Sequence, residues 1–127
     1  MCCGDYMLTF DEAQEALTAF IEELPPGIFD GLNCGVALLP DALYDENGIL
    51  ILGQYHVEPR GLGRYVTIQY GSLCVAYGYT SPEFFRQKIR DVLHHELTHH
   101  LESLAGDKSL ERQDAIDMRK ILGRRGY

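Results

Sequence analysis

Residues 81–106 are the longest regularly patterned stretch of the sequence and constrain the fold more than any other segment. Ser81-Pro82-Glu83 has the order of a helix start: an N-cap serine, a proline in the first turn and an early acid. Gly106 is expected to follow the helix in the left-handed conformation. Between them, apolar residues recur at spacings of three and four, as one side of a helix requires: Phe85, Ile89, Val92, Leu93, Leu97, Leu101 and Leu104.

The polar side of this predicted helix carries the motif His-Glu-x-x-His, formed by His95, Glu96 and His99. Residues four apart lie on one helix face, so the two imidazoles can be directed at one point. Zinc accepts imidazole nitrogens at about 2.0–2.1 Å in a tetrahedral arrangement. Glu96 lies about 100° further round the helix, where it can act as general base toward a metal-bound water. The motif predicts a Zn²⁺ cofactor held by His95 and His99 in a metal-dependent hydrolase.

The third protein ligand to the metal has two candidates. Glu102 lies three residues beyond the second histidine on the same face, and side chains tilt back along a helix in its direction. Asp107 follows Gly106, whose left-handed conformation would turn the chain toward the metal. Glu102 would then be solvated, or would orient a histidine without touching the metal. We favour Asp107 and keep Glu102 as the alternative.

The remaining histidines and two late acids receive no chemical role. His94 and His100 point away from the motif face and are expected to be surface or packing residues. His56 lies at the end of a predicted strand, where a lone histidine is usually a surface residue. Asp114 and Asp117 fall in a predicted last helix and are expected to be solvated.

The rest of the chain predicts helices on either side of a few strands. Thr9 and Glu12 form a capping box before a helix that ends at Pro25-Pro26-Gly27. A short helical turn is expected at residues 28–33, and a last helix at 110–122. Strands are predicted at residues 34–39, buried on both faces or nearly so, and at 49–57 and 65–70. The fold class is therefore α+β, a small mixed or antiparallel sheet packed on the motif helix with flanking N- and C-terminal helices.

Length and charge limit the class of protein. The 127 residues fit one domain, residues 1–127. A net charge of −8, from 19 acids against 11 lysines and arginines, argues against a nucleic-acid partner. The basic cluster Arg119-Lys120 with Arg124-Arg125 is assigned to a helix end, where cations favour the dipole.

The sequence also predicts a compartment. No run of about 18 apolar residues predicts a membrane span, and no secretory signal is visible. The four cysteines lack the spacing of a zinc ribbon, so a reduced cytoplasmic protein with free thiols is expected.

With these residues placed, the sequence resembles the small zincin-like metallopeptidase family of bacteria, formerly a family of unknown function. The resemblance covers most of the chain, including Glu23-Leu24-Pro25-Pro26 and the segment from His95 to His100. The family pattern is His-Glu-x-x-His-x-x-Gly-x-x-Asp, whose last Asp is taken as the third ligand. This chain has Glu102 at the glycine position and Ala105 at the aspartate position.

The resemblance implies a minimal zincin, with a few strands beside the active-site helix, that hydrolyses a peptide or protein substrate. An exposed strand edge could align an extended peptide by adding it to the sheet. A tyrosine could stabilise the oxyanion, but the sequence does not choose among its eight tyrosines. The alternatives are a catalytically inactive metal-binding or peptide-binding module and a small-amide hydrolase.

Overall fold

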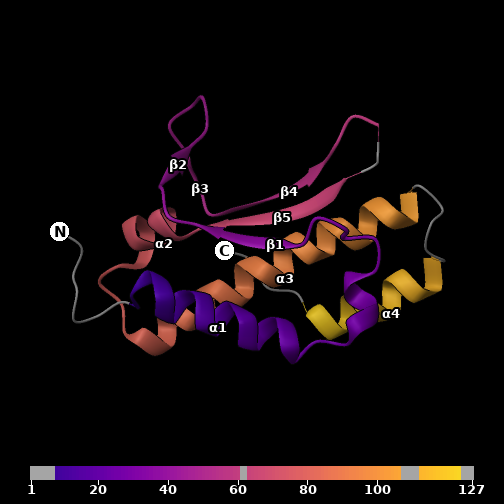
Figure 1. Ribbon diagram of the computed structural model, residues 1–127, viewed down its shortest axis with the longest axis horizontal. Helices are drawn as coiled ribbons and strands as arrows, with labels where there is room; N and C mark the ends of the chain where they lie inside the picture. Colours follow the sequence, from indigo (N-terminus) through magenta and orange to yellow (C-terminus); the bar gives the residue numbers. More distant parts are fainter. Residues whose placement is uncertain (1–7, 61–62, 107–111, 124–127) are drawn as a thin grey trace.

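The computed structural model describes residues 8–60, 63–106 and 112–123. It confirms the α+β class, with helices and two small sheets (Figure 1). In chain order the elements are α1 (Phe10–Glu22), the 3-10 turn η1 (Pro26–Phe29), β1 (Val36–Leu39), β2 (Leu43–Tyr44), β3 (Leu50–Ile51), β4 (Gly53–Val57), β5 (Arg64–Gln69), α2 (Tyr70–Tyr77), α3 (Pro82–Gly106) and α4 (Arg112–Leu122).

The motif helix α3 is the element on which the rest of the fold packs. It contacts α1, α2, α4, η1 and two strands of the sheet, β4 and β5. Its predicted start is confirmed, because the Ser81 hydroxyl accepts a 3.2 Å hydrogen bond from the Phe84 amide. The predicted apolar stripe is also confirmed, since each of its seven members is buried. α3 therefore crosses the core rather than lying on its surface.

The main sheet has the strand order β1-β5-β4, with β1 parallel and β4 antiparallel to β5. Figure 1 shows α1, α3 and α4 together on one side of it. Val66 and Ile68 of β5 are fully buried toward these helices. The prediction that residues 34–39 are buried on both faces is wrong. Ala37 and Leu39 of β1 are exposed, because in the described part of the chain no helix covers the other face of the sheet.

The prediction of one continuous strand at residues 49–57 is wrong. This stretch is interrupted at Leu52, so β3 pairs with β2 in a separate hairpin while β4 joins the main sheet. The strand predicted at residues 65–70 is confirmed as β5, and the chain continues directly from it into α2, a helix that the sequence analysis does not predict. The start of α2 fits closely against the loop after β1, because a Cβ on Gly71 would lie 2.6 Å from the Pro40 carbonyl oxygen.

The end of α3 also differs from the prediction. Gly106 is the last residue of the helix and is not among the glycines with positive φ. The expected left-handed turn at this residue is therefore wrong. Gly123 shows that conformation instead, with φ of 78° directly after α4.

The two flanking helices form as predicted. The capping box of α1 is complete, with a 3.1 Å bond from the Glu12 amide to the Thr9 hydroxyl and a 2.9 Å bond in return. α4 lies beside the second half of α3 in Figure 1. Asp114 and Asp117 are exposed on α4, as expected. None of the helices in the described residues is long and apolar enough to cross a membrane.

Candidate functional site

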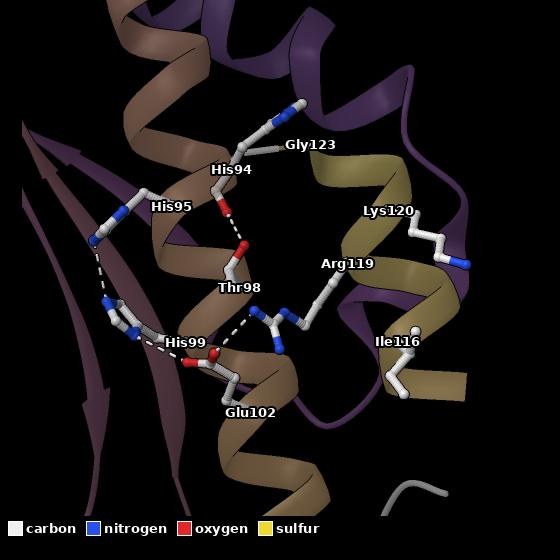
Figure 2. A pocket seen from close by; sticks show the side chains of 9 residues that line it. All are labelled: His94, His95, Thr98, His99, Glu102, Ile116, Arg119, Lys120 and Gly123. Atoms are coloured by element: carbon white, nitrogen blue, oxygen red, sulfur yellow. Dashed lines mark hydrogen bonds and ion pairs between the residues drawn. The ribbon is translucent and has the colours of Figure 1, made fainter. Parts of the chain in front are cut away.

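His95 and His99 are brought together on the face of α3 that turns away from its leucine stripe. Their Nε2 atoms are 3.1 Å apart, and their rings meet edge to face with centroids 4.7 Å apart. Figure 2 shows the two rings one turn apart with these nitrogens facing each other. His99 is exposed and His95 half-buried, so both can be reached from solvent.

Glu102 lies on the other side of the His99 ring from His95. Its Oε1 is 3.5 Å from His99 Nδ1, while its Oε2 is 3.5 Å from a guanidinium nitrogen of Arg119 in α4. Figure 2 shows this row running from His95 through His99 and Glu102 to Arg119. A carboxylate at Nδ1 is placed to orient the ring and leave Nε2 for another partner. Of the two roles considered for Glu102, the geometry suits orientation of His99 better than direct ligation.

The other candidate for the third ligand, Asp107, lies outside the described residues. Within the described ranges, no group of three or more His, Cys, Asp or Glu side chains is arranged to hold a metal ion. In the described part of the chain the structure thus brings His95 and His99 together without adding a third such side chain in the arrangement of a metal site.

Glu96 is 3 % exposed and lies where α3 packs on β4. It lines a cleft of about 700 Å³ together with both motif histidines and with Gly53 and Tyr55 of β4. The close packing of β4 on α3 requires a glycine at residue 53, because a Cβ there would lie 2.6 Å from Cγ1 of Val92. Gly53 was not predicted as part of the site, although a glycine inside a strand is a signal of close backbone approach.

The histidines that flank the motif are packing residues, one of the two roles expected for them. His94 is buried, and its Nδ1 is 2.8 Å from the carbonyl oxygen of Leu122, so it holds the end of α4 against α3. His100 is fully buried, and its Nε2 donates a 2.7 Å hydrogen bond to the carbonyl oxygen of Asp30. The four histidines of α3 thus divide into two that face the cleft and two that hold neighbouring segments.

His100 also belongs to a polar network that reaches the cleft through Tyr55 and Ser103. Since Nε2 carries the proton, Nδ1 accepts a 2.9 Å bond from the Tyr55 hydroxyl. That hydroxyl accepts a 2.9 Å bond from buried Arg64, which also donates to Ser103 in α3. Tyr55 is thereby fixed on β4, and among the described tyrosines it is the one that lines the cleft.

Burial lowers the pKa of His100 below its ordinary value of 6.5. The bond to the Asp30 carbonyl acts in the opposite direction, while the nearby Arg64 guanidinium lowers the pKa further and the Asp30 carboxylate raises it. Since burial has the largest effect, the folded protein favours neutral His100, in agreement with the hydrogen bonds that it makes.

His56 lies away from the motif histidines. Its ring stacks on Tyr65 with centroids 4.4 Å apart, and its Nε2 is 2.8 Å from the Thr67 hydroxyl. Tyr65 and Thr67 alternate along β5 with Val66 and Ile68, which face the helices, so His56 lies on the opposite face of the sheet. The expectation that His56 has no ligand role stays a prediction.

Comparison with known proteins identifies a similar solved structure. No protein-family model and no curated protein matches the sequence. A solved structure of a conserved hypothetical protein from Thermus thermophilus matches with a TM-score of 0.66 and 31% sequence identity. The match covers 78% of this chain and 99% of that one, so the two share essentially the whole of the shorter fold.

Proposed function

The chain belongs to the same protein family as the conserved hypothetical protein of Thermus thermophilus, and we propose that it is a zinc-dependent metallopeptidase with a minimal zincin-like fold. The observation that carries this proposal is the convergence of the Nε2 atoms of His95 and His99 beside buried Glu96. The two histidines proposed to bind the metal, the proposed base Glu96 and the edge of β4 all line one cleft.

The two histidines fit the requirement for zinc. Two nitrogens bound at about 2.0–2.1 Å to a tetrahedral zinc are about 3.3 Å apart, and the Nε2 atoms are separated by 3.1 Å. The same separation suits a hydrogen bond between the rings, so metal retention has to be measured. Glu102 supports the metal role of His99, because a carboxylate beside Nδ1 holds a ligating imidazole in one orientation.

Glu96 is the residue that we propose as general base. It follows His95 directly, so it lies beside the two histidines without sharing their face, and it is buried at the wall of the same cleft. When bound, zinc would supply a coordinated water with a lowered pKa and would polarise a carbonyl group. The Glu96 carboxylate takes a proton from the attacking water and delivers it to the leaving amine.

The edge of β4 favours a peptide as the substrate. β4 pairs with β5 on one side, and in the described part of the chain no strand pairs with its other side. Four of its residues, Gly53, Gln54, Tyr55 and Val57, line the cleft that contains the motif side chains. An extended peptide added to this edge would run past Glu96 and the histidines, with backbone hydrogen bonds fixing its position.

Two other functions remain candidates because Ala105 stands where the related pattern has a ligating aspartate, and because no three-ligand group occurs in the described ranges. The chain could bind a metal or a peptide without turnover, or hydrolyse a small amide. The three functions differ in whether zinc-loaded protein cleaves peptides, small amides or neither.

The test compares zinc-loaded wild type with Glu96→Gln on a library of quenched-fluorescence peptides and on small acyl amides. We expect cleavage of peptides, a loss of about 10²–10⁴-fold in the variant for a missing general base, and unchanged zinc content. Glu83→Gln is the matched control, since it removes an exposed acid from the first turn of the same helix. Cleavage of amides alone, or no cleavage by loaded wild type, would select one of the alternatives instead.

A further inference from the structure

A second cavity adjoins the motif histidines on the side of α3 that faces α4. Its volume is about 640 Å³, and it shares His95, His99 and Glu102 with the β4 cleft. From α4 it gains Ile116, Arg119 and Lys120. The histidine pair therefore lines both the cleft along the edge of β4 and this second cavity. Figure 2 shows the residues that line the second cavity.

Arg119 is the basic group best placed to meet a ligand in this cavity. It extends from α4 toward Glu102, with one guanidinium nitrogen 3.5 Å from Oε2 of that carboxylate. The side chains of Arg119 and Glu102 are 50% and 46% exposed. An ion pair so exposed contributes little to stability, so a carboxylate from a ligand can join or replace Glu102 at small cost. A guanidinium has five donors and matches a planar carboxylate in two-point contact.

We propose that the α3–α4 cavity is a subsite for a carboxylate of the substrate, bound by Arg119. The inference rests on the proposed peptidase function, and it names the substrate class as peptides that carry an acidic side chain or a free C-terminal carboxylate beyond the scissile bond. Arg119 is linked to His99 through two 3.5 Å contacts with a single carboxylate between them. Two or three residues of extended chain, at about 3.3 Å each, span such a separation.

The charge of the protein limits which class of anionic ligand the cavity can bind. The chain has a net charge of −8, which disfavours polyanions such as nucleic acids. Against that background Arg119 and Lys120 supply a local positive wall, and Ile116 supplies apolar surface next to it. This combination suits one carboxylate on a short aliphatic stem rather than a chain of phosphates.

The test measures binding by the catalytically silenced full-length Glu96→Gln protein, both zinc-free and zinc-loaded, using NMR titration with the Ile116 methyl signal as reporter. One series consists of alanine-rich hexapeptides, blocked at both ends, with Glu or Gln at each position in turn. A second series compares a free with an amidated C-terminus in the all-alanine peptide. We expect the acidic member of at least one pair to bind about 3- to 5-fold more tightly, as a half-exposed charge pair allows. The series that shows the preference identifies the source of the carboxylate.

Arg119→Gln should reduce that preference to less than about twofold, while leaving the affinity for neutral peptides unchanged. Arg86→Gln, which removes an exposed arginine near the start of α3, should keep it. Equal binding of acidic and neutral peptides by wild type, or a preference that survives Arg119→Gln, overturns the subsite. Because the readout is binding, a chain that prefers acidic peptides but cleaves none would refute the peptidase proposal alone. A chain that cleaves peptides without the preference would refute the subsite alone.

Discussion

Gly53 of β4 and Glu96 of α3 are in such close contact that a Cβ on the glycine would lie 3.3 Å from Cγ of the glutamate. The same Cβ would lie 2.6 Å from Cγ1 of Val92, a separation that real Cβ atoms do not show. The absence of a side chain at residue 53 thus lets the edge strand approach the helix at the residue proposed as general base. The close contact at Gly53 therefore helps to set the position of β4 relative to Glu96.

Gly53→Ala is therefore expected to push β4 away from α3. Overpacking of this kind costs about 1–3 kcal/mol in the free energy of unfolding, which urea denaturation measures. Peptidase activity should fall by up to about 10²-fold, because small displacements of a catalytic group are costly. Gly27→Ala is the control, since its Cβ would make an ordinary 3.5 Å contact with Met118. A Gly53→Ala protein with wild-type stability and activity would show that the contact does not constrain the site.

Burial of His100 predicts a specific dependence of stability on pH. Its pKa in the folded protein lies below 6.5, its ordinary value. Between these two pKa values the unfolded chain binds the proton and the folded chain does not, so stability falls as the pH is lowered through this window. The slope due to one proton is at most about 1.4 kcal/mol per pH unit.

Urea denaturation of wild type and His100→Gln gives the free energy of unfolding at each pH from 7.5 to 5. A chelator is present so that both proteins are compared without bound metal. The variant should be less stable at neutral pH, because the bonds to Tyr55 and Asp30 are lost or altered. It should also lose the part of the slope below pH 6.5 that comes from His100. Identical slopes would mean that His100 titrates normally when folded.

Much of the fold could be predicted because its signals are local. The capping box at Thr9 and Glu12 and the spacing of apolar residues in α3 each depend on neighbours within one or two turns. α2 was missed because Gly71 to Tyr77 is a short apolar run whose helical form depends on burial by other segments rather than on a polar face. The break at Leu52 likewise depends on which sheet each half of the run joins.

The candidate site likewise contains residues that local spacing predicts and a residue that depends on how distant segments pack. The motif fixes His95, Glu96 and His99 because helical spacing alone places them. Arg119 could be predicted only as a cation at a helix end, because its contact with Glu102 depends on how α4 docks against α3. That docking uses the hydrogen bond between His94 and the Leu122 carbonyl, which joins residues 28 positions apart.

The third ligand can be identified by three substitutions. If Asp107 ligates the metal, Asp107→Ala should weaken zinc affinity far more than Glu102→Ala. Loss of an orienting carboxylate costs about 10–100-fold, which is the effect expected for Glu102→Ala. Gly106→Ala should leave affinity near wild type, because Gly106 is helical and a Cβ there meets no atom within 4 Å. Competition titration against a zinc chelator gives all three values. A larger loss in Glu102→Ala than in Asp107→Ala would make Glu102 the ligand.

Zinc binding by His95 and His99 is measured most directly as the zinc content of untagged protein by elemental analysis. We expect about one zinc per chain, lost in the double variant His95→Ala, His99→Ala. It should be kept in His56→Ala, which removes a histidine from the opposite face of the sheet. Wild type that holds no zinc after incubation with the metal, or a double variant that holds as much as wild type, would contradict zinc binding by this pair.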